Sequence, residues 1–376
     1  MKITFPHMGY SYIAFSSLLR DLGHEPVVPP VPSKRTLDLG VQFAPEFACI
    51  PFKVLLGTYL ETIRMGAEMA LTSGGVGPCR AGYYGVLHQK ILDDLGHKFK
   101  IVVFEPPLRN IADFIRKIKM VKPKNMSWRT LIQIVKKNWA KLSATDEIEY
   151  LSHQIRPREA VRGETTRAFK EALTFLEQAE TTEQIEEARQ EGKKRLQQVE
   201  VDEEREILKV GIIGEIYVVL EPAVNFDLQI TLGEMGVYAD RSIWLTQWTK
   251  DNTLSDGEKD VRQAARPYLN ELIGGHGINS VGETVLYAKK GFDGVVQLAP
   301  FSCIPEIVAK GILPRVTKDF GIPVLTLFID EQTGKEGVRT RLEAFVDLLW
   351  QRRFFKARNG RGAGSNLDVP EVSLAT

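Results

Sequence analysis

The chain has 376 residues, of which 43% are hydrophobic and 26% charged, and its formal net charge is +1. This length predicts two or three domains with an ample core. The balanced charge gives no global attraction to nucleic acid or to an anionic membrane, and no apolar run approaches the roughly 18 residues that a membrane-spanning helix needs. The N-terminal residues enter a strand pattern directly, without a targeting peptide, so we expect a cytoplasmic protein.

Over residues 1–106, short strand patterns alternate with helix patterns. We expect strands at residues 2–5, 25–28, 69–72 and 99–104, and helices at residues 10–22, 51–66 and 83–95. The helices are indicated by apolar residues at helical spacing, such as Ile13, Leu18 and Leu22 in the first. Strands separated by helices of this length imply a parallel, doubly wound sheet, and therefore an N-terminal Rossmann-like lobe.

Residues 107–206 have a different character, because charge rises and glycine nearly vanishes. Ala168, Leu173, Leu176 and Ala179 recur at helical spacing, which predicts a helical insertion or connector. The basic residues between 116 and 124 raise the idea of a patch for RNA or for CoA phosphates. We favour a solvated helix face, because acidic residues follow and the overall charge is balanced.

The alternating pattern restarts in residues 207–355, which we expect to form a C-terminal Rossmann-like lobe. The expected strands are residues 209–215, 295–298 and 323–328, and the expected helices are residues 227–235 and 340–350. Residues 356–376 have the composition of a flexible tail. The predicted fold class is therefore α/β, with two Rossmann-like lobes whose parallel sheets face a cleft, plus a helical insertion.

The three cysteines of the chain lie in special backbone settings. Residues 44–51 read Ala-Pro-Glu-Phe-Ala-Cys-Ile-Pro, and residues 299–305 nearly repeat this as Ala-Pro-Phe-Ser-Cys-Ile-Pro. The third cysteine lies in the glycine-rich residues 74–82. At the start of a helix, backbone N–H groups and the helix dipole lower a thiol pKa and favour the metal-binding thiolate. Cys49, Cys79 and Cys303 therefore indicate a shared inorganic site, and we favour an iron–sulfur cluster.

Other interpretations of the cysteines stay open at this stage. A free cysteine is commonly a small buried hydrophobic residue. A disulfide is disfavoured by the odd cysteine count and by the expected intracellular setting. Structural zinc usually has four ligands and a Cys-x-x-Cys pair, which this chain lacks, and the clustered cysteine spacing of ferredoxins is also missing.

The predicted topology brings the three cysteines together. Cys79 and Cys303 each follow a predicted strand, and Cys49 precedes a helix in the same layer of loops. Ligands of open parallel sheets collect beyond the carboxyl ends of the strands. We therefore expect the three cysteines to converge between the N-terminal and C-terminal lobes.

Several segments together resemble a known family. They are residues 44–57, 74–82, 210–215, 292–303 and 340–345. As a set they resemble the 2-hydroxyacyl-CoA dehydratase and benzoyl-CoA reductase group, and most of all its stand-alone branch of activase-related proteins. The resemblance covers most of residues 1–105 and 209–350, and we find none in the helical middle or the tail.

The resemblance implies Rossmann-like lobes that hold a [4Fe-4S] cluster in their cleft, with Cys49, Cys79 and Cys303 as its ligands. It also implies an anaerobic setting, an acyl-CoA or other small-molecule substrate, and an actin-fold ATPase activator that supplies low-potential electrons. Three thiolates leave one iron of a cubane open to water, a fourth side chain or substrate. A homo- or heterodimer is left open, and the motifs do not name the substrate.

Polar and glycine residues near the cysteines are candidates to complete the site. The candidate catalytic residues are Glu46, Lys53, Arg80, Glu215 and His276, and the candidate cofactor-binding residues are Gly75, Gly77 and Gly82. Glycine lets backbone N–H groups approach cluster sulfur closely, and His276 is also a candidate fourth ligand or proton donor. The alternatives are a helix cap for Glu46, surface charges for Lys53, Arg80 and Glu215, and a plain turn for His276.

Three functions compete on these grounds. The first is a cluster-dependent 2-hydroxyacyl-CoA dehydratase-like lyase or reductase. The second is a non-catalytic electron-transfer or accessory protein of an ATP-dependent activase system. The third is a structural protein whose cysteines are buried and bind nothing.

Overall fold

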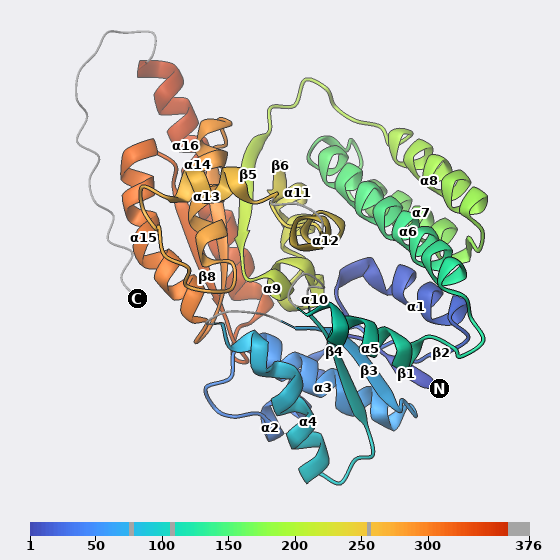
Figure 1. Ribbon diagram of the computed structural model, residues 1–376. Helices are drawn as coiled ribbons and strands as arrows, with labels where there is room; N and C mark the ends of the chain where they lie inside the picture. Colours follow the sequence, from blue (N-terminus) through green and yellow to red (C-terminus); the bar gives the residue numbers. More distant parts are fainter. Residues whose placement is uncertain (75–78, 106–109, 254–256, 360–376) are drawn as a thin grey trace.

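The computed structural model describes residues 1–74, 79–105, 110–253 and 257–359. Figure 1 shows two separate sheets, one in the blue to teal part of the chain and one in the yellow-green to orange part, with helices packed beside them. The predicted fold class is confirmed, because both sheets are four-stranded, parallel and flanked by helices.

The N-terminal sheet has the strand order β2-β1-β3-β4, with every neighbouring pair parallel. Its strands are β1 (Lys2–Thr4), β2 (Glu25–Pro26), β3 (Met69–Ser73) and β4 (Lys100–Phe104). The helices of this lobe are η1 (Gly9–Ser11), α1 (Tyr12–Asp21), α2 (Lys34–Phe43), α3 (Ile50–Arg64), η2 (Arg80–Tyr83) and α4 (Tyr84–Asp94). All four strands and all three helices expected here exist, and the sequence reasoning missed α2.

Helices α2 and α3 cross at a pair of glycines. A Cβ atom on Gly40 would lie 1.7 Å from the carbonyl oxygen of Lys53, and one on Gly57 would lie 1.8 Å from that of Thr36. Real Cβ atoms cannot approach backbone so closely, so both positions require glycine for this crossing. The crossing fixes the short loop between the two helices, which carries Cys49.

The C-terminal sheet repeats the arrangement, with the order β6-β5-β7-β8 and parallel neighbours throughout. Its strands are β5 (Leu208–Gly214), β6 (Val237–Arg241), β7 (Gly294–Pro300) and β8 (Val324–Ile329). Its helices are α9 (Ile216–Leu220), α10 (Pro222–Asn225), α11 (Leu228–Glu234), α12 (Leu245–Thr253), α13 (Lys259–Ala265), α14 (Gly277–Lys289), α15 (Ile304–Phe320) and α16 (Lys335–Asn359). The sequence reasoning missed β6.

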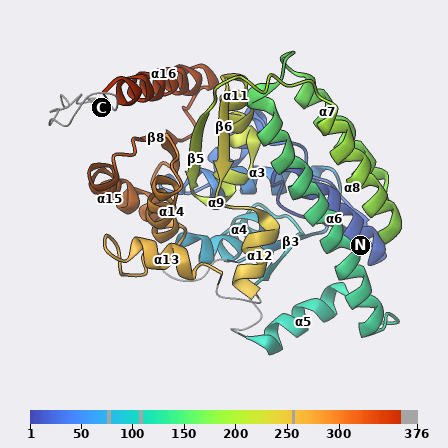
Figure 2. The same ribbon diagram turned by 90° about the horizontal axis from the view of Figure 1, so that it is seen from above.

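Between the sheets in sequence, the described residues from 110 to 206 are mainly helical. They form α5 (Ile111–Val121), α6 (Trp128–Ile155), η3 (Arg156–Arg158), α7 (Glu164–Gln178) and α8 (Thr182–Gln197). Figure 2 shows α6, α7 and α8 running side by side. Ala168, Leu173 and Leu176 of α7 are buried in their shared core, as their helical spacing predicts. Thr181 and Gln184 form a capping box that starts α8.

The two lobes share one hydrophobic core. Leu56 and Tyr59 of α3 belong to the same buried cluster as Val218 of α9 and Leu298 of β7. This packing holds the loops at the carboxyl ends of both sheets against each other. In the part of the chain that the structure describes, no helix is long and apolar enough to cross a membrane.

Candidate metal centre

Each of the three cysteines occupies the N-cap position of a helix. Cys49 precedes α3, Cys79 precedes η2, and Cys303 precedes α15. All three have extended backbone, with φ of −69°, −69° and −77°. Proline stands in the first turn of α3 and of α15, as the repeated Cys-Ile-Pro sequence predicts.

The sheets deliver these residues to one layer of loops. Cys79 lies in the loop after β3, and Cys303 follows the last residue of β7, Pro300, by three positions. Glu215 directly follows β5, the strand next to β7. The carboxyl ends of the central strands therefore supply the site, which is the usual position for ligands of parallel sheets.

Contacts between the cysteine loops show that they meet. The carbonyl oxygen of Phe47, two residues before Cys49, accepts a 2.8 Å hydrogen bond from Arg80 Nη1 and a 3.1 Å hydrogen bond from Ser302 Oγ. Ser302 has a φ of +64°, a left-handed conformation that is strained for a residue other than glycine. One carbonyl thus joins the segments that precede or follow all three cysteines.

The thiols also lie within electrostatic range of one another. Cys79 acts to raise the pKa of Cys49, and Cys49 acts in the same direction on Cys303. A Cβ atom on Gly275 would lie 3.7 Å from Cys79 Sγ and 3.1 Å from Cγ of Pro305, two residues after Cys303. The loops of the three cysteines therefore lie close together, and a site shared by all three thiols remains a prediction. Cys303 is more deeply buried than the other two cysteines.

The expected depression of the thiol pKa values is wrong for the protein without a bound group. Burial raises the pKa of Cys49 to about 11 and also raises the pKa of Cys79 and Cys303. A backbone N–H group of the following turn opposes this shift at each thiol, namely that of Phe52, Ala81 or Glu306. The cost of burying an anion exceeds the gain from one N–H donor, so the thiols are neutral until a cation balances them.

Tyr84, in the first turn of α4, is a site residue that the sequence reasoning missed. Its hydroxyl is hydrogen-bonded to Cys49 Sγ. Its ring packs edge-on against Phe52, with 5.2 Å between ring centroids, and His88 lies beside both rings. A tyrosine at helical spacing normally indicates core packing, so the sequence carried no signal for this contact.

Two carboxyl groups lie close to the thiols. Glu215 acts on all three thiols, and burial raises its own pKa to about 7, although the N–H of Val218 donates to it at 2.9 Å. Burial also raises the pKa of Glu306 to about 7, and this side chain accepts hydrogen bonds from Ser280 and Gln297. Glu215 was expected in the site, and Glu306 was not.

The other polar candidates have different surroundings. Lys53 is buried rather than on the surface, and its Nζ is 3.1 Å from Glu331 Oε1 in the loop after β8. This ion pair connects the two lobes. Arg80 is exposed and binds the Phe47 carbonyl, and Glu46 is also exposed.

His276 is the N-cap residue of α14 and adjoins Gly275, the residue that packs against Cys79. Burial lowers the pKa of His276 to about 4, so the imidazole is neutral at pH 7, the form that binds metals. The structure thus brings the Gly274–Gly277 segment to the cysteines, and a role for the His276 ring itself remains a prediction.

Of the three glycines predicted to bind the cofactor, only Gly82 lies among the described residues. Gly75 and Gly77 lie outside the described residues. Gly82 lies in η2, where its N–H donates to the carbonyl oxygen of Cys79 at 3.3 Å. The N–H of Ala81, rather than that of Gly82, faces the Cys79 thiol.

The donor set favours a cluster over a single ion. Among the described residues, no group of three or more His, Cys, Asp or Glu side chains converges tightly enough to hold one metal ion. Three thiols at three helix N-termini, each facing a backbone N–H, are chemically suited to iron–sulfur ligation, in which N–H groups commonly bond to sulfur. The chemistry of these donors is therefore compatible with iron–sulfur ligation.

Comparison with known proteins gives one match. A family model described as 2-hydroxyglutaryl-CoA dehydratase, D-component, matches residues 89–349. The matched region contains Cys303, Glu215 and His276 and begins after Cys49 and Cys79. It also runs through the helical residues 107–206, for which the sequence motifs had indicated no resemblance. No curated protein matches the chain.

Proposed function

Because the chain belongs to the family of the 2-hydroxyglutaryl-CoA dehydratase D-component, we propose that it is a cluster-binding component of an enzyme that acts on a CoA thioester. The substrate class is a thioester of a 2-hydroxy acid or a related acyl-CoA. The observation that carries this proposal is that Arg80 and Ser302 both donate hydrogen bonds to the Phe47 carbonyl, which joins the loops of the three N-cap cysteines.

The proposed cofactor is one [4Fe-4S] cluster held by Cys49, Cys79 and Cys303. When bound, such a cluster supplies single electrons at low potential and an iron that polarises a carbonyl oxygen. Three thiolates would leave one iron position for substrate, and His276, whose neighbour Gly275 lies beside Cys79, is a candidate for a competing ligand. This support comes from the donor set, the helix N-termini and the family.

The surrounding residues tune and orient this centre. The N–H groups of Phe52, Ala81 and Glu306 hydrogen-bond to the thiolate sulfurs and stabilise their negative charge. The hydrogen bond between the Tyr84 hydroxyl and Cys49 Sγ holds that sulfur in place, and a thiolate at Cys49 would accept it. Glu215, which lies close to all three sulfurs, is the proposed group that holds or moves a proton at the reacting end of the substrate.

Exposed apolar side chains surround the cysteines and support docking of a protein partner. They belong to the same three segments and are Phe47, Tyr83, Val86, Phe301, Ile304 and Ile307. Exposed apolar residues gathered in this way commonly mark a protein interface. We propose that this rim receives the ATP-hydrolysing activator that delivers electrons.

An EPR titration tests this function. The protein is purified anaerobically and reduced, and spectra are recorded with 2-hydroxyglutaryl-CoA or with free CoA as the control. We expect the thioester to change the spectrum and free CoA to leave it unaltered. A spectrum that ignores the thioester would instead support an electron carrier that does not bind substrate.

A further inference from the structure

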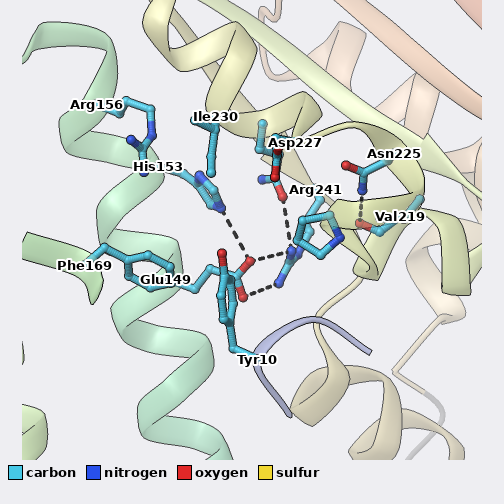
Figure 3. Close-up of a pocket in the computed structure, with 12 residues that line it drawn as sticks. Tyr10, Glu149, His153, Arg156, Phe169, Val219, Asn225, Asp227, Ile230 and Arg241 are labelled. Atoms are coloured by element: carbon cyan, nitrogen blue, oxygen red, sulfur yellow. Dashed lines mark hydrogen bonds and ion pairs between the residues drawn. The ribbon is translucent and has the colours of Figure 1, made fainter. Parts of the chain in front are cut away.

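Away from the cysteines, a pocket lies between the long helix α6, the η1 turn and the α10–α11 segment of the C-terminal lobe (Figure 3). Two of its residues follow strands of the two sheets: Tyr10 lies in the loop after β1, and Arg241 is the last residue of β6. The pocket is therefore near the same layer of loops as the cysteines, but beside other strands. The pocket has a cavity volume of about 20 Å³, counted as the room for the centres of water molecules. This is room for one or two waters, or for the two oxygens of a carboxylate.

The pocket contains an arginine with unused hydrogen-bond donors. Arg156 is only 1% exposed, and its Nη1 donates to Thr166 Oγ1. Its Nε and Nη2 are buried and have no hydrogen-bond partner among the described residues. These two atoms form one edge of the guanidinium, and that edge matches the two oxygens of a carboxylate.

Neighbouring residues leave room for the side chain of Arg156 and hold it in place. A Cβ atom on Gly233 of α11 would lie 2.5 Å from Cδ of Arg156, so the absent side chain makes room for the arginine stem. Phe226 and Asp227, just before α11, both have left-handed backbone, with φ of 61° and 56°. Consecutive strained residues of this kind persist where the surrounding structure requires them, often beside a ligand.

The other charged groups around the pocket are paired with one another or with groups outside it. Arg241 and Glu149 form a bidentate ion pair, with both N–O distances 2.8 Å, and neutralise each other. Burial acts to raise the pKa of Glu149, but Arg241 and His153 hold it down to about 2. Asp227 is directed to Lys335 at 3.3 Å, so neither of these two ion pairs uses the free donors of Arg156.

The carboxylate that most favours the charged form of Arg156 is that of Glu159, but its oxygens are already used. They accept the N–H groups of Gly163 at 2.9 Å and Thr165 at 2.8 Å. Glu159 therefore balances the charge of Arg156 without accepting a hydrogen bond from its Nε or Nη2, and these two buried donors are left without an acceptor among the described residues.

Two further donors line the same space. Both ring nitrogens of His153 are buried without a hydrogen bond, and its Nε2 is 3.6 Å from Glu149, beyond hydrogen-bonding distance. Tyr10 stacks edge-on against Phe169, with 4.9 Å between ring centroids, and brings its hydroxyl to the pocket. Val219, Pro222 and Ile230 add apolar lining, and Asn225 and Gln229 add polar lining.

We propose that this pocket binds the carboxylate group of a small organic acid, with Arg156 as its charge partner and Tyr10 and His153 as further hydrogen-bond donors. The two oxygens of a carboxylate match the two adjoining free donors of Arg156, and the small volume suits a compact acid such as formate or acetate. The inference goes beyond the proposed function and does not depend on the cluster.

Thermal unfolding and calorimetric titration of the full chain test this site. Sodium acetate and sodium formate are the probes, with sodium chloride and inorganic phosphate at equal ionic strength as comparisons. We expect a saturable rise in Tm with the carboxylates alone. A rise of the same size with chloride, saturable binding of phosphate in place of carboxylate, or no rise at all would overturn the proposal.

Variants assign the effect to the pocket. Arg156→Met should abolish the acetate-dependent rise, and Tyr10→Phe should weaken acetate binding about tenfold through loss of one charge-assisted hydrogen bond. The control, Arg116→Gln, removes an exposed arginine that pairs with Asp113 on α5 and should bind acetate as the original chain does. If the Arg156→Met variant does not fold, the acetate affinity of the Tyr10→Phe variant tests the site instead. An affinity equal to that of the original chain would then contradict the proposal.

Discussion

The guanidinium of Arg80 donates a 2.8 Å hydrogen bond to the carbonyl oxygen of Phe47. Ser302 donates to the same oxygen at 3.1 Å, across 255 residues of sequence. These two bonds hold the loops of Cys49, Cys79 and Cys303 to one another. The geometry of the proposed cluster therefore depends on an arginine that does not itself ligate iron.

Arg80→Gln should loosen the cluster without unfolding the protein. Arg80 is exposed, so global stability should change little. Loss of the bond to Phe47 should let the loops separate, and iron release to a chelator should become several-fold faster, followed by the decay of cluster absorbance. Arg116→Gln is the matched control, because Arg116 is an exposed arginine paired with Asp113 on α5. Equal release rates in all three proteins would show that the bond does not hold the site.

The buried ion pair between Lys53 and Glu331 should contribute to stability. Glu331→Gln leaves the Lys53 ammonium buried without an anionic partner, so we expect a loss of about 1–3 kcal/mol in the free energy of unfolding by urea, since Glu331 is partly exposed. Glu343→Gln breaks the exposed pair with Arg339 and should have no measurable effect. Equal stability of the two variants would contradict a structural role for the Lys53 pair.

The close crossing of α2 and α3 predicts intolerance to one methyl group. Gly57→Ala places a Cβ against the Thr36 carbonyl and should destabilise the protein by about 1–3 kcal/mol. Gly311→Ala is the control, because a Cβ there meets no atom within 4 Å in the middle of α15. It should stabilise the protein by about 0.5–1 kcal/mol through helix propensity. Chemical denaturation measures both, and a neutral Gly57→Ala would refute the tight crossing.

Glu283 on α14 should make stability depend on pH. Burial raises its pKa to about 7, Asp240 and Glu258 act in the same direction, and Lys290 opposes them. Because the folded state holds this proton more tightly than the unfolded state, its contribution to stability falls as pH rises from about 4.5 to 7.

Glu283→Gln should remove that loss. The variant should match the original chain near pH 4.5 and exceed its free energy of unfolding by about 1–2 kcal/mol near pH 8, after allowance for partial exposure. Glu343→Gln serves as the exposed control. A difference that is constant across this pH range would contradict the assignment to Glu283.

The sequence predicted the lobes well because parallel strands are buried apolar runs separated by helices. It missed β6 because Val237–Arg241 mixes apolar and charged residues and directly follows a short helix. It also missed α2, whose start depends on a capping box at Ser33 and Thr36 that lies just after a proline-rich loop. Local pattern gave little signal for either element.

The candidate site was only partly predictable. The repeated Cys-Ile-Pro sequence led to the N-cap cysteines, because proline in the first turn is a local signal. Tyr84 and Glu306 could not be found in this way, since their roles arise from contacts between loops. The thiol pKa values were misjudged because a helix N-terminus is visible in sequence and the depth of burial is not.

The most direct test of the central claim is the iron and acid-labile sulfide content of the full chain after anaerobic purification. The account predicts about four of each per chain, as a [4Fe-4S] cluster requires. Replacing Cys49, Cys79 or Cys303 by serine should lower both values sharply, and His276→Ala should leave them unaltered. Absence of iron and sulfide from the original chain, or full retention in the serine variants, would contradict the three-cysteine cluster.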